Sequence, residues 1–291
     1  MVDTGFSAPT QLAEAVEMLS RPGAVALSGG TDLLVQLRGG RSAPALIVDL
    51  KRIDELQQIN FGEQWITIGA AVTGQQITDH AELQSLFPGF VEGVGLIGST
   101  QVQGRATPVG NLCNGSPAAD AVPAMIAAGA VCDIVGPNGA RQLPVVELPV
   151  GPGKIALEQG EIVTAINLPR PRVGQADAYL RFIPRTEMDI AVAGAAVNLT
   201  CATDGTVENA AVAIGAVAPT AMTVPAAADA LVGSKLDDTA LTAAAAAVSA
   251  AASPISDKRG PADYRRRIVG VLVRRAALLA AERATQSRQG G

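Results

Sequence analysis

Apolar positions in the first part of the chain predict a helix, a strand, a second helix and a second strand. Apolar residues recur at helical spacing from Leu12 to Leu19, and Arg21-Pro22-Gly23 is expected to end that helix. Residues 24–34 have the pattern of a short strand that passes through two glycines into a helix. Residues 45–50 form the second apolar run and are predicted to be a strand.

Two hairpins are predicted in the middle of the chain. The apolar runs 56–61 and 65–70 flank a Gly62-Glu63-Gln64 turn. The runs 130–135 and 140–146 flank Pro137-Asn138-Gly139, which is a strong turn signal.

The other segments of the chain indicate an α+β protein. Helices are expected over residues 73–84, 91–103, 122–130, 224–232, 239–252 and 261–284. Strands are expected over residues 161–168, 178–184, 190–200 and 207–218. The segment 168–175, with two prolines and a glycine, is predicted to be a domain linker. Strands followed by helices after this linker favour a separate α+β domain.

Composition and charge exclude several classes of protein. Of the 291 residues, 48% are hydrophobic and 17% charged, which is typical of a globular protein, and the net charge of −5 argues against nucleic-acid binding. The three cysteines form no C-x-x-C pair, so we expect no metal site and a reducing compartment. No apolar stretch is long enough to span a bilayer, and we expect a soluble, cytoplasmic chain.

The first candidate binding segment is the glycine loop Ser28-Gly29-Gly30-Thr31-Asp32. Glycine lets the backbone approach a ligand closely, and the loop opens a predicted helix, whose free N–H groups suit a pyrophosphate. The spacing is not the G-x-G-x-x-G of a Rossmann site. The alternative is an ordinary turn from strand to helix, with Thr31 or Asp32 as N-cap.

The second candidate segment is residues 104–120, which are dense in Gly, Pro, Asn and Ser and are predicted to form a long loop. With aromatics at only 3%, a cofactor would be held by backbone and small polar groups, and this segment supplies hydroxyls, amides and a carboxylate. These groups belong to Thr107, Ser116, Asn111, Asn114 and Asp120. The alternative is a surface loop with Asp120 near a helix start.

Five segments in order along nearly the whole chain resemble the FAD-binding medium subunits of the molybdenum hydroxylases, which include carbon monoxide dehydrogenase-type enzymes and are similar to the FAD domain of xanthine dehydrogenase. The segments are SGGTDLL (28–34), IGSTQVQGRATPVGNLCNGSPAAD (97–120), GPGKIALEQGEIV (151–163), YLRFIPRTEMDIA (179–191) and PADYRRRIVGVLVRRA (261–276). The resemblance implies a two-lobed vanillyl-alcohol-oxidase/PCMH-type FAD-binding domain and a smaller C-terminal α+β domain. The expected divisions are 1–172 (lobes 1–55 and 56–172), 176–285 and a tail 286–291.

The resemblance also implies which residues bind FAD, non-covalently and with no catalytic side chain. The pyrophosphate is expected against Ser28, Gly29, Gly30, Thr31, Asp32 and Leu33, and from the other lobe against Thr107, Gly110 and Asn111. Ser116 and Asp120 are expected at the ribityl hydroxyls. Neighbours of the isoalloxazine ring are expected to be Ile162, Leu168 and the segment from Arg181 to Asp189, with Arg181 and Arg185 as candidate charges beside the ring.

Two positions depart from the family pattern. The family often has T-I-G-G-N where this chain has Thr107-Pro108-Val109-Gly110-Asn111, and Gln103-Gly104 replaces the usual Arg-Asn. Val109 in place of a glycine leaves the FAD affinity open. The role of the arginines in the last helix is open as well. They either form a solvated face or dock onto an acidic partner surface.

The implied function is electron transfer. A large partner subunit would oxidise the substrate at a molybdenum cofactor, a small partner would relay electrons through 2Fe–2S clusters, and FAD on this chain would pass them to an external acceptor. The expected assembly is a dimer of heterotrimers. The alternatives are a stand-alone FAD-dependent oxidoreductase and a structural subunit without redox function. The substrate and the acceptor are not determined by this sequence.

Overall fold

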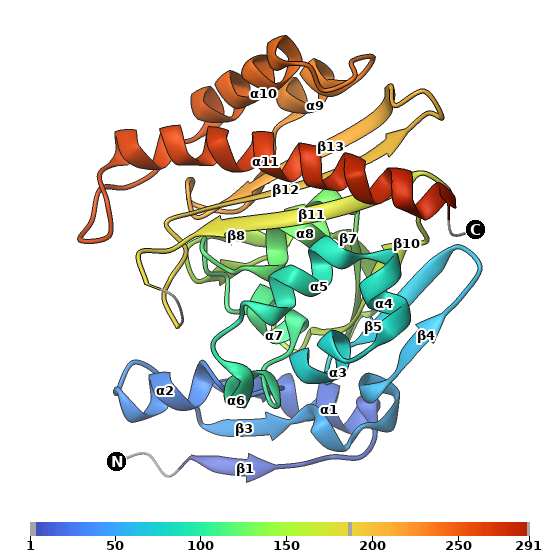
Figure 1. The fold of residues 1–291 in the computed structure, drawn as a ribbon. Coiled ribbons are helices and arrows are strands. Elements are labelled where there is room, and N and C mark those ends of the chain that lie inside the picture. Colours follow the sequence, from blue (N-terminus) through green and yellow to red (C-terminus); the bar gives the residue numbers. More distant parts are fainter. Residues whose placement is uncertain (1–3, 186–187, 290–291) are drawn as a thin grey trace.

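The fold has three layers stacked along one direction, as Figure 1 shows for the computed structural model, which describes residues 4–185 and 188–289. The N-terminal layer is a parallel sheet of three strands in the order β1-β3-β2. Its elements are β1 (Gly5–Ser7), α1 (Leu12–Leu19), β2 (Ala24–Leu27), α2 (Leu33–Arg38) and β3 (Leu46–Asp49). The predicted order of helix, strand, helix and strand is confirmed from α1 to β3, whereas strand β1 before them was not predicted.

The central layer combines a five-stranded antiparallel sheet with six helices. The sheet order is β4-β5-β10-β6-β7, and both predicted hairpins are present as β4/β5 and β6/β7. The strands are β4 (Ile59–Phe61), β5 (Trp65–Gly69), β6 (Val131–Gly136), β7 (Gly139–Pro144) and β10 (Ile162–Pro169). The helices are α3 (Gly74–Thr78), α4 (Ala81–Leu86), α5 (Pro88–Gly95), α6 (Thr100–Gln103), α7 (Pro108–Cys113) and α8 (Ala121–Ala127).

Short elements complete this layer. They are the 3-10 helices η1 (Leu50–Arg52), η2 (Asp54–Gln57) and η3 (Val145–Glu147), and the small hairpin β8 (Pro149–Gly151) with β9 (Lys154–Ile155). The helix expected over 73–84 is interrupted at Asp79 and His80, because His80 leaves the helical conformation to become the N-cap of α4. The helix expected over 91–103 is likewise two helices, α5 and α6, separated near Gly98, whose φ of +65° lies outside the right-handed helical region.

The C-terminal layer is an antiparallel sheet in the order β11-β12-β13-β14, with three helices on its outer face (Figure 1). The elements are β11 (Gln175–Phe182), β12 (Ala193–Cys201), β13 (Val207–Gly215), β14 (Met222–Thr223), α9 (Pro225–Leu231), α10 (Asp238–Ala251) and α11 (Ala262–Gln289). Strand β12 is buried on both faces: Ala195 and Val197 belong to the core under these helices, and Ala196 to the core of the central layer. The sheet therefore joins the two cores.

Two expected boundaries are corrected. Strand β10 extends to Pro169, so the connection between the central and C-terminal sheets is residues 170–174. The expected tail 286–291 is wrong for residues 286–289, which continue helix α11, and residues 290–291 lie outside the described part of the chain. In the described residues, no helix is both long and apolar enough to cross a membrane.

The arginines of helix α11 are used largely within the chain. Arg265, which is 3% exposed, donates to the carbonyl oxygen of Val192 and pairs with Asp257. Arg274 pairs with Asp238 on α10 at 2.6 Å. Arg265 and Arg274 therefore hold α11 against its own domain. For these two arginines, the structure shows contacts within the chain in place of a solvated face or a partner surface.

The central and C-terminal layers meet at the N-terminus of helix α5. A Cβ on Gly89 would lie within 2.8 Å of the backbone of Ala178, so helix and strand are in direct backbone contact. The buried carboxylate of Asp177 accepts hydrogen bonds from the N–H groups of Gly89 at 2.8 Å and Phe90 at 2.9 Å. It thereby supplies two of the acceptors that a helix start lacks.

We expect Asp177→Asn to reduce the pH dependence of stability. Burial raises the pKa of Asp177 to about 7, more than the two N–H donors lower it. Between about pH 4 and pH 7 the folded chain then holds a proton that the unfolded chain has lost, so the free energy of unfolding falls as pH rises through this interval. Melting curves at several pH values test this, with Asp229→Asn on the exposed side of α9 as control. Equal slopes for Asp177→Asn and the unmodified chain would contradict it.

Candidate functional site

A cavity of about 460 Å³ lies between the N-terminal sheet and the central layer. Its volume is in the range of small-molecule sites. Its wall is formed by strand β2, the glycine loop 28–32, helix α2, residues 106–114 and residues 155–163. Both candidate binding segments of the sequence therefore meet at one cavity, although about 75 residues separate them along the chain.

The glycine loop, which lines this cavity, contains a row of backbone donors without acceptors in the described part of the chain. Within the described residues, the N–H groups of Gly29, Gly30, Thr31, Asp32 and Leu33 donate to no backbone or side-chain acceptor. Gly30 has a φ of +78°, which favours glycine and turns the chain from β2 into α2. Successive free N–H groups in such a turn form a concave anion site.

The loop is a turn from strand to helix with Asp32 at the N-cap position, as the alternative expected, but it lacks the side-chain bond of a cap. Asp32 is the N-cap residue of α2, but its side chain accepts no hydrogen bond from the helix start. Thr31 precedes the cap position and also lines the cavity. The donors at the start of α2 therefore have no acceptor among the described residues.

The second candidate segment contains a helix that the sequence analysis did not predict. Thr107 is the N-cap of α7 and Pro108 its first residue, and the Thr107 hydroxyl accepts from the Gly110 N–H at 2.9 Å. A Thr-Pro pair is a helix start signal, so the helix could have been recognised within the polar run. The expectation of a continuous loop over 104–120 is wrong for residues 108–113.

Hydroxyl groups join the two segments. The Ser28 hydroxyl donates to the carbonyl oxygen of Ala70 at 2.8 Å and lies 3.0 Å from the Thr107 hydroxyl. Because the single proton of Ser28 is used on Ala70, Thr107 is the donor to Ser28. Ser28 and Thr107 therefore hold the two lobes together and keep their side chains in fixed positions at the cavity wall.

The backbones of the glycine loop and the second segment are also in direct contact. A Cβ on Gly29 would collide with the carbonyl oxygen of Arg105 and lie 2.9 Å from the Cα of Ala106. Gln36 on α2 also donates to Asn114 at 3.3 Å, and both residues line the cavity. Glycine at position 29 is thus required by the approach of the second segment.

The apolar part of the wall comes from segments that are distant in sequence. Ile162, expected beside the flavin, lines the cavity, and so do Ile97, Ile155, Leu157 and Val163. These last four residues were not among the expected site residues, although all lie in segments that carry the family resemblance. Leu168 does not belong to the wall: it is fully buried on β10, where it pairs with Ile66 of β5.

Asp120 and Arg181 form a buried ion pair that is not part of the wall. Their side chains approach to 2.5 Å, and the Tyr179 hydroxyl donates to Asp120 at 2.9 Å. Burial raises the pKa of Asp120 to about 6, against the opposing effects of Arg181 and Tyr179. Arg181 also donates to the carbonyl oxygen of Leu96, which precedes Ile97 of the cavity wall. Its buried Nε has no acceptor among the described residues.

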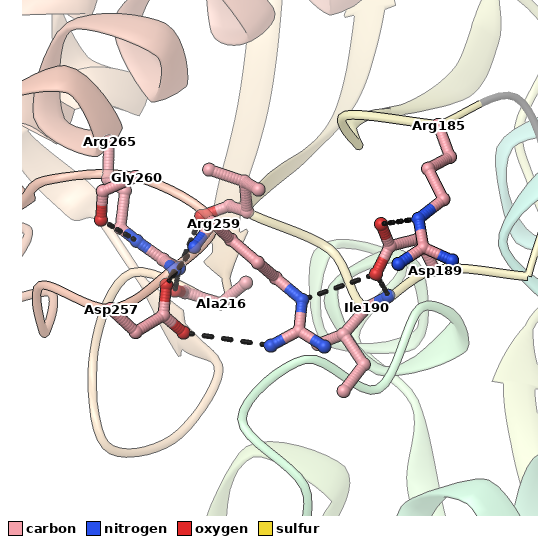
Figure 2. A network of polar contacts seen from close by, with 9 residues as sticks. Arg185, Asp189, Ile190, Ala216, Asp257, Arg259, Gly260 and Arg265 are labelled. Carbon is pink, nitrogen blue, oxygen red and sulfur yellow. Dashed lines mark hydrogen bonds and ion pairs between the residues drawn. The ribbon is translucent and has the colours of Figure 1, made fainter.

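Two further expected residues lie apart from the cavity. Ser116 does not line the cavity, and its hydroxyl oxygen accepts from the N–H of Ala118 at 3.3 Å in a local turn. Arg185 is 77% exposed and pairs with Asp189 at 3.5 Å. Figure 2 shows that Asp189 is also held by Arg259, at 3.2 Å.

The ion pairs in Figure 2 connect two loops of the C-terminal layer. Asp257 lies between Arg259 and Arg265, at 3.7 Å and 2.6 Å. Residues 186–187, which belong to the segment expected near the flavin ring, lie outside the described residues. Arg185 thus belongs to a surface network and not to the wall.

Comparisons with known proteins identify the family. Residues 2–171 match the family model described as the FAD binding domain in molybdopterin dehydrogenase, and residues 178–280 match the CO dehydrogenase flavoprotein C-terminal domain. The chain belongs to the FAD-binding subunits of the molybdenum hydroxylase family. It is thus the flavoprotein subunit of an oxidoreductase, and its cofactor is FAD.

Individual members of the family are similar over most of the chain or nearly all of it. The carbon monoxide dehydrogenase medium chain of Afipia carboxidovorans is 35% identical over 96% of this chain and 97% of its own. The xanthine dehydrogenase FAD-binding subunit of Escherichia coli O157:H7 is 33% identical over 72% of each. A crystal structure of Cu,Mo-CO dehydrogenase contains a chain that superposes with a TM-score of 0.93 at 34% identity, covering 97% of this chain and 99% of that chain.

We expect Gly29→Ala to destabilise this molybdenum hydroxylase flavoprotein by roughly 1–3 kcal/mol, because the added Cβ pushes against the Arg105 carbonyl. Thermal unfolding measures the loss. Gly104→Ala is the matched control in the second segment, since its Cβ would meet only the Gln101 carbonyl, at 3.8 Å. Equal melting temperatures for the two variants would show that the loops do not depend on close contact.

Proposed function

We propose that FAD binds in the cavity with its pyrophosphate against the backbone donors of residues 29–33. The observation that carries this proposal is the row of N–H groups without acceptors, next to the point where Gly29 meets the second segment. A pyrophosphate supplies several acceptor oxygens and negative charge, and backbone donors in a turn suit both. The residues present therefore fit the cofactor of the family.

Other expected contacts are proposed on different grounds. Thr107, Gly110 and Asn111 line the cavity and remain candidates for the pyrophosphate, although the Thr107 hydroxyl and the Gly110 N–H already have partners within the protein. Beside Ile162, we propose Val163 in place of Leu168 at the ring. Ser116 and Asp120 are weaker candidates for the ribityl chain, because neither residue lines the cavity.

Arg181 is proposed to act on the pyrimidine end of the ring. Its side chain is 6% exposed, its Nε has no acceptor among the described residues, and it contacts the segment that carries Ile97 into the wall. A buried positive group stabilises negative charge that develops near it. The pairing with Asp120 reduces this effect and fixes the orientation of the guanidinium.

We propose that the chain passes electrons from the 2Fe–2S clusters of a small partner subunit to an external acceptor. FAD, when bound, supplies the redox chemistry, since it accepts electrons one at a time. The chain's own residues bind, orient and shield the cofactor. That relatives are medium chains and FAD-binding subunits of larger enzymes supports a large and a small partner. We propose a dimer of heterotrimers. The division into domains 1–172 and 176–285 and the cytoplasmic location remain predictions.

We expect the purified chain to take up FAD, and Asn111→Ala to weaken the affinity roughly 10-fold by removing a polar group from the cavity wall. Flavin absorbance and fluorescence titration measure the uptake. Asn60→Ala, on the exposed edge strand β4, is the control that leaves the affinity unchanged. A folded chain that takes up no FAD, alone or with its partners, would favour the structural-subunit alternative.

We expect Arg181→Met to lower the reduction potential of the bound flavin, because a positive group near the ring favours the reduced anion. Spectroelectrochemical titration of the FAD-loaded chain gives the potential. Arg185→Met removes the same charge from an exposed site and should leave the potential unchanged. Equal potentials in both variants would exclude Arg181 as a neighbour of the ring.

A further inference from the structure

Lys51 lies beside the glycine loop but does not line the cavity. Its Nζ donates to the carbonyl oxygen of Ser28 at 3.0 Å and to Asp49 Oδ1 at 2.6 Å. Its side chain is 24% exposed, and that of Asp49 is 14% exposed. The ammonium is therefore largely enclosed between the start of the loop and one carboxylate.

The position of Lys51 follows from the parallel sheet. Strand β3 pairs with β2 so that Asp49 lies opposite Leu27, the last residue before the loop. Asp49 then caps the 3-10 helix η1 by accepting from the Lys51 N–H at 3.0 Å. This cap turns the Lys51 side chain back toward the end of β2, where the loop begins.

The contact with Lys51 fixes the direction of the first loop peptide. The described chain contains no cis peptide bond, and in a trans peptide the C=O of one residue points opposite to the N–H of the next. Because the Ser28 carbonyl points to Lys51, the Gly29 N–H points away from Lys51. That N–H is the first of the free donors at the cavity wall.

The described cavity wall itself offers no positively charged side chain to an anion. Among the described residues that line the cavity there is neither a lysine nor an arginine, so an anion there depends on neutral N–H groups. Such donors attract an anion only while they point at it. A peptide flip at Ser28–Gly29 would replace the N–H by a carbonyl oxygen, and glycine offers little steric resistance to that rotation.

We infer that Lys51 is a positioning residue for the cofactor pyrophosphate, holding the Ser28–Gly29 peptide with its N–H toward the cavity. Lys51 acts through the loop and touches no bound group. The inference rests on the proposed binding of the FAD pyrophosphate at residues 29–33.

The test is a titration of the full-length apo chain with FAD, with ADP in competition, and with riboflavin. In Lys51→Met we expect FAD and ADP to bind roughly 10- to 100-fold more weakly, and by the same factor, since both carry the pyrophosphate. Riboflavin, which lacks phosphate, should keep its affinity. Lys51→Arg restores a donor and should recover most of the loss. Arg52→Met removes the same charge from the exposed neighbouring position and should change nothing.

The possible outcomes separate the inference from the proposed site. If the unmodified chain binds neither FAD nor ADP, alone or with its partners, the proposed site is wrong and the role of Lys51 is wrong with it. If the unmodified chain binds both and Lys51→Met binds them equally well, only the role of Lys51 is wrong. A variant that loses FAD, ADP and riboflavin together, with a lower apo melting temperature, would show that Lys51 supports only the fold.

Discussion

The site depends on one steric constraint, the backbone contact between the glycine loop and the second segment at Gly29. No side chain fits between this residue and the Arg105–Ala106 backbone, so the two lobes are joined along the rim of the cavity. The hydrogen bond between Ser28 and Thr107 lies at the same junction. With one side of the loop fixed against the second lobe, its free N–H groups are left for the cavity.

Small residues also allow close backbone contact where the C-terminal layer packs against the central layer. Helix α5 meets β11 at Gly89, and β12 supplies alanines to the cores on both of its faces. Close approach of backbones leaves little room for large rings, which agrees with an aromatic content of 3%. Buried polar groups then fix the orientation of the layers: Asp177 holds the start of α5, and the Asp120–Arg181 pair crosses from α8 to β11.

The sequence predicted local structure well and long-range contacts poorly. Periodicity located the hairpins and the helices of the C-terminal domain, because these patterns depend on neighbours in sequence. It missed α7, whose start signal is hidden in a polar run. It also placed Leu168 at the site, since an apolar residue on a strand has the same pattern whether it faces a cavity or the core. Asp120 and Arg181 are 61 residues apart, and no local pattern in a single sequence predicts that they pair.

The family departure at Val109 is best judged against the contact at Gly29. Val109 is 4% exposed and packs into the core of the central layer as well as against the cavity, inside the regular helix α7. The loop–loop contact involves residues 105 and 106, before that helix, so the valine leaves it intact. The described wall has no lysine or arginine, so in the proposed site an anionic cofactor meets neutral donors. The loop donors among them lie beside Gly29 and Lys51 and not beside position 109.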